Sequence, residues 1–301
     1  MLRRWRARAE QNYLARLGAA LRGRRMLVTG ASSGIGRAFV LQAARAGAEL
    51  VLVSRRGEEL EQVAEDCERL GGRAQVRTAD LSSVESCRAL AESVLREDGP
   101  VDILVNNAGH SIRRAVVDYK AEDLARLVAV NYLGPMTLTL GLLPAMLDRG
   151  AGHIVQISTI GVQTGAPNFA AYVAAKAASD HFARTLRLEL GGRGIAVTTI
   201  QVPLVRTAML APTRIYDAFP ALGAEQAARR IGWAVATRPV RVAPRWATLL
   251  EVVHAVAPDL LQWVFTHGHE PFHRAMARRL ERMNRRNSSP GTERGSTYGR
   301  R

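Results

Sequence analysis

The sequence contains little cysteine, little lysine and no long run made only of apolar residues. Two cysteines in 301 residues, Cys67 and Cys87, exclude a disulfide-stabilised scaffold and a cysteine-rich zinc module. No run of 18 consecutive apolar residues is present, so we expect no transmembrane helix, and the basic start of the chain lacks the apolar segment of a signal peptide. We therefore expect a cytoplasmic protein with reduced thiols.

The net charge of +15 is concentrated at the two ends of the chain. Residues 1–25 and residues 274–301 each carry +7, which leaves +1 on the residues between them. Such ends are either solvated tails or contacts for an anionic membrane surface. A nearly neutral centre without an aromatic stacking platform argues against a nucleic-acid binder.

Residues 1–24 are interpreted as a basic, imperfectly amphipathic arm. An apolar residue recurs every four positions, at Trp5, Ala9, Tyr13, Leu17 and Leu21. This stripe would bind anionic lipid peripherally, or pack on the protein's own domain or a partner subunit.

Apolar runs alternate with amphipathic runs from residue 25 to residue 245. The apolar runs predict seven strands, within 26–30, 49–56, 74–81, 101–107, 152–159, 195–202 and 239–243. Helices are expected at 35–46, 58–70, 83–97, 121–147 (kinked near Gly134-Pro135), 168–190 and 224–236. This order predicts an α/β fold, a doubly wound parallel seven-stranded sheet of Rossmann type, as a single domain over 25–245. A helical appendix (246–286) and a tail of disordered composition (287–301) follow.

A glycine-rich turn joins the first predicted strand to the first helix of this domain. Gly30 permits a tight turn, Gly34 lets the backbone approach a pyrophosphate, and Gly36 lets the helix pack closely on the sheet. The helix N-terminus offers free N–H groups to phosphates. The sequence therefore predicts a dinucleotide site at this turn, contacted by Gly30, Ser32, Ser33, Gly34, Ile35 and Gly36.

The end of the second strand carries arginines where a carboxylate would bind the ribose of NADH. Arg55 and Arg56 lie there, and Arg37 follows the glycine turn. Guanidinium groups pair with a 2′-phosphate, so the pattern favours NADPH (NADP⁺) over NADH. The alternative is that these arginines are solvated charges at the strand end.

Tyr172 and Lys176 form the candidate catalytic pair. Their i, i+4 spacing places both side chains on one face of a helix. A nearby ammonium and a nicotinamide cation would lower the pKa of the phenol, which could then exchange a proton with a carbonyl group.

Together these motifs resemble the classical short-chain dehydrogenase/reductase family over residues 24–245. The resemblance is carried by the TGxxxGxG turn, by Asp80-Leu81, by the NNAG motif at 106–109 and by YxxxK at 172–176. It implies a cofactor site that includes Asp80, Leu81, Asn107, Ala108, Gly109, Tyr172, Lys176, Val205 and Thr207. It also implies a homo-oligomer.

The same resemblance completes a catalytic tetrad around the pair. Ser158 would bind the substrate oxygen, Asn131 would hold a water in a proton relay, and Lys176 would also bind the nicotinamide ribose. One departure concerns the end of the sixth strand, where Pro203 replaces the family's usual glycine and leaves the nicotinamide geometry at 202–204 open.

The segments 107–114, 158–164 and 203–213 are similar to bacterial fatty acyl-CoA reductases of this type. That similarity implies reduction of a long-chain acyl-CoA to an aldehyde, with the loop 204–222 as a lid and cations for the CoA phosphates at Arg113, Arg114, Arg206 and Arg214. The alternatives are a reductase or dehydrogenase of a lipophilic ketone or secondary alcohol, and a scaffold without turnover. No metal site is expected, because the late cluster of His267, His269 and His273 has no cysteine partner.

Overall fold

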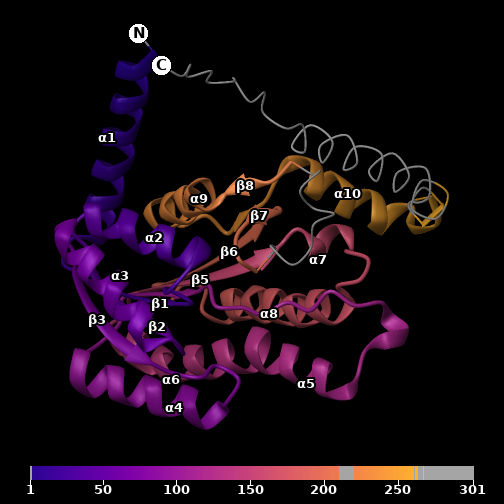
Figure 1. Cartoon of the computed structure of the whole chain (residues 1–301), viewed down its shortest axis with the longest axis horizontal. Helices are drawn as coiled ribbons and strands as arrows, with labels where there is room; N and C mark the ends of the chain where they lie inside the picture. The colour runs from indigo at the N-terminus through magenta and orange to yellow at the C-terminus, as the bar shows by residue number, and fades with distance from the viewer. Residues whose placement is uncertain (1, 210–219, 261, 264–266, 268–301) are drawn as a thin grey trace, which may run out of the picture. The chain divides into compact units, whose positions relative to one another are not determined.

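The computed structural model describes residues 2–209, 220–260, 262, 263 and 267. The chain divides into two compact units, residues 1–212 with 221–252, and residues 213–220 with 253–301. The first unit contains a parallel sheet in the order β3-β2-β1-β4-β5-β6-β9 (Figure 1). Its strands are β1 (Arg25–Thr29), β2 (Glu49–Ser54), β3 (Arg73–Thr78), β4 (Ile103–Asn106), β5 (Gly152–Thr159), β6 (Ile195–Val202) and β9 (Arg241–Val242). The predicted seven-stranded doubly wound sheet is confirmed.

Helices cover both faces of this sheet (Figure 1). One face carries α1 (Leu2–Leu21), α2 (Gly34–Arg45), α3 (Gly57–Arg69) and α9 (Ala224–Thr237). The other carries α4 (Val84–Ser93), α6 (Gly134–Asp148) and α8 (Ala170–Glu189), with α5 (Ala121–Val128) beside α8. Along β1, Met26 and Val28 join the first core and Leu27 joins the second. Strands buried on both faces explain the nearly uninterrupted apolar runs in the sequence.

The second half of α1 belongs to the folded domain. Leu17 and Leu21 are fully buried in the core that contains α2 and α9. The Tyr13 hydroxyl donates a 2.8 Å hydrogen bond to Gln42 Oε1, and Gly232 provides the space for that hydroxyl. The predicted apolar stripe is therefore used for packing on the protein's own domain at these three positions.

The long predicted helix is built from three helical segments in direct succession. A π-helical segment, Ala129–Leu133, separates α5 from α6 immediately before Gly134-Pro135, the position of the predicted kink. Gly134 is required because any side chain there would meet the carbonyl oxygen of Leu81. Ala121–Asp148 is long and apolar enough to span a membrane, but half of its apolar window is buried in the fold. Leu138 and Leu142 of α6 are core residues of the second face.

Beyond β6 the chain forms a short pair of strands that the sequence did not predict, and a helix where the helical appendix was expected to begin. Two two-residue strands, β7 (Val205–Arg206) and β8 (Leu222–Gly223), pair in parallel. Helix α10 (Arg245–Val256) begins inside the first unit, whose boundary falls after residue 252. Most of the predicted lid, the appendix beyond residue 267 and the disordered tail lie outside the described residues.

Candidate active site

The carboxyl end of β1 and the first turn of α2 form a tight backbone cradle. Gly30 has a φ of 68°, and a Cβ there would lie 2.9 Å from the Cα of Ala108. A Cβ on Gly36 would collide with the carbonyl oxygen of Gly30. Gly34 has a φ of 56°. Because the first N–H groups of a helix have no partner within it, this cradle can accept a pyrophosphate.

Thr29, which the sequence analysis did not single out, connects this turn to the NNAG motif after β4. Its Oγ1 accepts hydrogen bonds from the backbone N–H groups of Asn107 and Ala108, both at 3.0 Å. Asn107 in turn donates from Nδ2 to the carbonyl oxygens of Thr29 and Gly30. Asn107 therefore holds the glycine turn in shape, a contact that its place in a four-residue motif did not reveal.

The three arginines predicted to bind a 2′-phosphate lie in different surroundings. Arg56 donates to Ser32 Oγ and Ser33 Oγ, both at 2.8 Å, which places its guanidinium on the glycine turn. Arg37 instead forms a 2.7 Å ion pair with Asp66 on α3. Arg55 makes no ion pair among the described residues. Its positive charge contributes to lowering the pKa of Asp80 and of His110. The structure thus brings Arg56 to the candidate cofactor cradle and directs Arg37 away from it.

Asp80 and Leu81 follow β3 at the same edge of the sheet. Asp80 Oδ1 accepts a 3.0 Å hydrogen bond from the backbone N–H of Ser82. This bond lowers the pKa of Asp80, so the carboxylate is charged. Leu81 is buried beneath Gly134.

The segment after β6 reaches the glycine turn. A Cβ on Gly34 would lie 3.2 Å from Thr207 Cγ2, so Thr207 stands beside the N-terminus of α2. Val205 is buried in β7. β6 ends at Val202, directly before Pro203.

Asn131, Gly109 and Lys176 meet at the centre of the site. A Cβ on Gly109 would lie 3.0 Å from Asn131 Oδ1 and 3.3 Å from Lys176 Nζ. Asn131 belongs to the π-helical segment, and its side chain bonds the backbone N–H and carbonyl groups of His110 and the carbonyl of Leu127. Its own carbonyl oxygen accepts a 2.5 Å hydrogen bond from Ser179 Oγ. Asn131 is thus already fully engaged with the chain, which its position in the sequence did not show.

Burial governs the ionisation of the catalytic pair in this chain. It raises the pKa of Tyr172 to about 12, so the phenol is protonated at neutral pH. Burial lowers the pKa of Lys176 to about 8, and the charge of Asp180 opposes that shift. The Tyr172 hydroxyl makes no hydrogen bond to any other described residue and is available to a ligand.

Ser158 and Thr159, adjacent at the end of β5, point to different surroundings. Ser158 is 1% exposed, and its hydroxyl lies beside the Asp180 carboxylate on α8. Thr159 is half-buried and is the last residue of the strand. A Cβ on Gly161 would lie 3.5 Å from Thr159 Cγ2 and 3.1 Å from Val173. Gly161 stands between Thr159 and the first turn of α8, which carries Tyr172, and its backbone N–H donates a 3.2 Å hydrogen bond to Thr159 Oγ1. Thr159 was not predicted as a site residue, although it lies thirteen residues before Tyr172.

Neither cysteine belongs to the candidate active site. They are buried in α3 and α4, and burial raises the pKa of Cys67 to about 12 and that of Cys87 to about 11. Neither supplies a thiolate nucleophile. Among the described residues no group of histidine, cysteine or acidic side chains is arranged to hold a metal.

The arginines predicted at the mouth of the site differ in their exposure and in their ion pairs. Arg114 is paired with Asp123, whereas Arg113 is exposed. Arg206 is exposed on β7, and Arg214 lies outside the described residues. His110, unnoticed in the sequence, follows the NNAG motif, and burial and neighbouring arginines lower its pKa, so it is neutral at pH 7.

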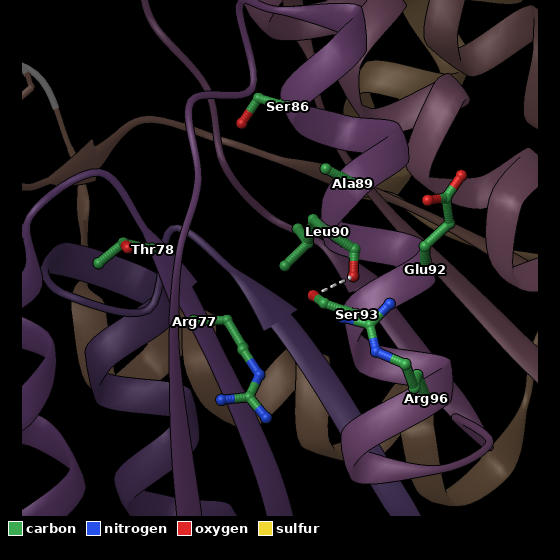
Figure 2. Close-up of a pocket in the computed structure, with 8 residues that line it drawn as sticks. All are labelled: Arg77, Thr78, Ser86, Ala89, Leu90, Glu92, Ser93 and Arg96. Atoms are coloured by element: carbon green, nitrogen blue, oxygen red, sulfur yellow. Dashed lines mark hydrogen bonds between the residues drawn. The ribbon is translucent and has the colours of Figure 1, made fainter.

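A groove of about 350 Å³ between β3 and α4 is separate from these residues (Figure 2). It is lined by Arg77, Thr78, Ser86, Ala89, Leu90, Glu92, Ser93 and Arg96. Arg77 is held there by two hydrogen bonds to the buried Asp98, at 2.6 and 3.0 Å. The groove contains none of the predicted site residues.

A family model described as short chain dehydrogenase matches residues 24–216. The chain belongs to the short-chain dehydrogenase family. It is 42% identical to a fatty acyl-CoA reductase of Acinetobacter baylyi over 254 residues, 84% of this chain and 86% of that protein. It is also 42% identical to a fatty acyl-CoA reductase of Mycobacterium tuberculosis over 267 residues, 88% of this chain and 87% of the relative.

A solved short-chain dehydrogenase from Sphingobium yanoikuyae, in complex with NADPH, has a similar fold. The TM-score is 0.70 at 28% identity, over 79% of this chain and 95% of that chain. Short-chain dehydrogenases are oxidoreductases that use NAD or NADP, so this short-chain dehydrogenase is an oxidoreductase with a nicotinamide cofactor.

Proposed function

We propose that this protein is an NADPH-dependent fatty acyl-CoA reductase that converts a long-chain acyl-CoA to a fatty aldehyde and free CoA. The observation that carries the proposal is the similarity to two proteins named as fatty acyl-CoA reductases, which extends over more than four fifths of this chain and of each relative. The absence of a thiolate nucleophile among the two cysteines agrees with direct reduction of a thioester without an acyl-enzyme.

The residues present fit a dinucleotide cofactor with a 2′-phosphate. Gly30 and Gly36 leave a backbone cradle that any Cβ would fill, and Arg56 lies on that cradle through Ser32 and Ser33. We assign the pyrophosphate to the N-terminus of α2, the 2′-phosphate to Arg56 with Arg55, and the adenine to Asp80. Thr207 and Val205 would hold the carboxamide, and Lys176 the nicotinamide ribose.

The cofactor, when bound, supplies a hydride to the thioester carbonyl carbon. Tyr172 gives its hydroxyl proton to the carbonyl oxygen, which yields a hemithioacetal. The C–S bond then breaks, the sulfur leaves as the CoA thiol with a proton, and the carbonyl of the aldehyde re-forms. Lys176 stabilises the phenolate that Tyr172 becomes, through its positive charge. Asn131, through its hydrogen bonds to His110, holds the backbone next to Gly109 in place, and Tyr172 regains its proton from solvent.

Of the two hydroxyls at the end of β5, we assign the contact with the substrate oxygen to Thr159. Thr159 is half-buried at the end of the strand, with Gly161 between it and the first turn of α8. Ser158, the residue expected from the sequence, is enclosed and lies beside Asp180. We therefore propose that Ser158 supports the site from within.

The test compares substrates under identical conditions. Purified protein with NADPH is given palmitoyl-CoA, a long-chain aldehyde, and lipophilic ketones, and each product is identified by mass spectrometry. The proposal expects fatty aldehyde from palmitoyl-CoA. Turnover of ketones without any reaction of acyl-CoA would instead identify a reductase of a lipophilic ketone or secondary alcohol.

Two partners are proposed on narrower grounds. Exposed apolar residues on α5 and α6, among them Leu124, Val128 and Leu140, support a homo-oligomer, which light scattering after gel filtration measures. Contact with an anionic membrane from the cytoplasmic side rests on the two basic ends of the sequence. Salt-dependent sedimentation with anionic vesicles tests it.

A further inference from the structure

Asp180 is a half-buried acidic residue on α8 that has no role in the reaction described above. Tyr172, Lys176 and Asp180 follow one another at intervals of four residues, so they lie along one face of the helix. A carboxylate removed from water stays charged only where partners compensate the lost solvation. The pKa of Asp180 is raised overall, chiefly by burial and further by Glu251, while Ser158, Arg241 and Gln201 oppose the rise.

A chain of polar side chains is bonded to Asp180. Gln201 on β6 donates from Nε2 to Asp180 Oδ2 at 3.0 Å and accepts from Arg241 Nε at 2.8 Å. Arg241 on β9 pairs with Glu251 on α10 at 2.5 Å. Gln163 donates to the same carboxylate at 2.8 Å. The chain thus connects α8, across β6 and β9, to α10.

Asp180 also interacts with Lys176 and Ser158. The charge of Asp180 favours the protonated form of Lys176. Asp180 Oδ1 and Ser158 Oγ are both buried atoms. Neither has a hydrogen-bond partner with acceptable distance and angles among the described residues. The charged groups that face Asp180 are therefore Lys176 and Arg187 on its own helix, Arg241 on β9 and Glu251 on α10.

We propose that Asp180 is a positioning residue: Gln201 and Arg241 hold its carboxylate one helical turn from Lys176 on α8, where it is the counter-charge of that ammonium. The inference concerns the same site as the proposed function and deepens it. The direct test of the inference needs no enzymatic turnover, so the inference and the proposed function can fail separately.

The lysine content of the chain makes Lys176 directly measurable. Only two lysines are present, Lys120 and Lys176, and Lys120 is exposed. Protein labelled with ¹³C at lysine Cε gives two NMR signals, and the Lys120→Arg variant identifies the signal of Lys176. A pH titration of each signal then gives each ammonium's pKa.

Asp180→Asn keeps the shape and a hydrogen-bond acceptor for Gln201 but removes the charge. The proposal expects the pKa of Lys176 to fall by ~1 unit or more, as loss of a close opposite charge implies, with Lys120 unchanged. Arg241→Gln, which leaves α8 intact, should move Lys176 in the same direction by less. Glu189→Gln, which removes an exposed acid on the same helix, is the matched control and should move neither signal.

An unchanged pKa of Lys176 in both Asp180→Asn and Arg241→Gln would overturn the inference, whatever the activity. With active enzyme, the alkaline limb of the NADPH oxidation rate should move to lower pH in Asp180→Asn by the same amount as the NMR titration. A shifted lysine in a protein that reduces no acyl-CoA would leave the inference standing and refute the proposed function.

Discussion

Lys176 Nζ donates a 3.0 Å hydrogen bond to the carbonyl oxygen of Ile157, the residue before Ser158 in β5. This bond fixes the catalytic face of α8 against the end of the strand. An ammonium has three donors, so two remain for a ligand or for Asp180. The proposed mechanism therefore depends on both the charge of Lys176 and its position against β5.

The first prediction concerns the pH dependence of carbonyl reduction. Burial lowers the pKa of Lys176 to about 8, so its charge is present below that pH and is lost above it. Tyr172, with a pKa of about 12, keeps its proton across the same range. The rate should therefore fall as pH rises through about 8, which steady-state kcat between pH 6 and 10 measures. Lys176→Arg should abolish this limb, because guanidinium stays charged, and a wild-type rate that is flat to pH 10 would contradict the assignment.

The second prediction concerns cofactor choice. Arg56→Ala should weaken NADPH binding roughly tenfold or more, since a charge-assisted hydrogen bond contributes ~1.5–3 kcal/mol, and should leave NADH binding nearly unchanged. Arg37→Ala is the matched control and should have the smaller effect, because Arg37 is paired with Asp66. Calorimetric titration with both cofactors measures the difference. Equal wild-type affinities for NADPH and NADH would refute the assignment of the 2′-phosphate.

The third prediction separates the two hydroxyls of β5. Thr159→Val removes the hydroxyl that we assign to the substrate oxygen, and should lower kcat by a factor of ~100–1,000, as loss of one such donor does elsewhere. Ser158→Ala should cost less in kcat and should instead move the pH profile, because it removes a neighbour of Asp180. The reverse order of effects on kcat would return the catalytic role to Ser158.

The fourth prediction concerns the N-terminal helix. Leu17 is fully buried, so Leu17→Ala should lower the free energy of unfolding by ~2–5 kcal/mol. Asn12→Ala, an exposed position on the same helix, should change it by less than ~0.5 kcal/mol. Urea denaturation followed by circular dichroism measures both. Equal free energies of unfolding for the Leu17→Ala and Asn12→Ala variants would mean that α1 does not pack on the domain.

Much of the sheet could be predicted because its strands are buried on both faces. The runs around Leu27, Leu104 and Val155 carry apolar residues at nearly every position, a pattern that neither an exposed strand nor an amphipathic helix produces. The pair β7–β8 could not be predicted, since two-residue strands are too short for any periodicity. The spacing of Tyr13, Leu17 and Leu21 showed an apolar stripe on α1, but not the surface that the stripe contacts.

The motifs of the site could be predicted from the sequence, but the contacts between its side chains could not. Tyr172, Lys176 and the glycine turn have spacings that follow from helix and turn geometry. Which way Ser158 faces depends on where β5 ends, and one residue of difference exchanges the two sides of a strand. Asp180 looks like any acidic residue on a helix surface until α8 is packed against β5 and β6. That Arg37 is occupied by Asp66 depends on how α2 packs against α3, which sequence spacing does not encode.

The most direct test of the central claim measures two products in one reaction. Purified protein is mixed with NADPH and palmitoyl-CoA, and NADPH oxidation at 340 nm is followed together with the release of free thiol. The account predicts one CoA thiol released for each NADPH consumed. Tyr172→Phe should lower both rates by ~10²–10⁴ while its NADPH affinity stays nearly unchanged. Oxidation of NADPH with no release of CoA from any acyl-CoA would contradict it.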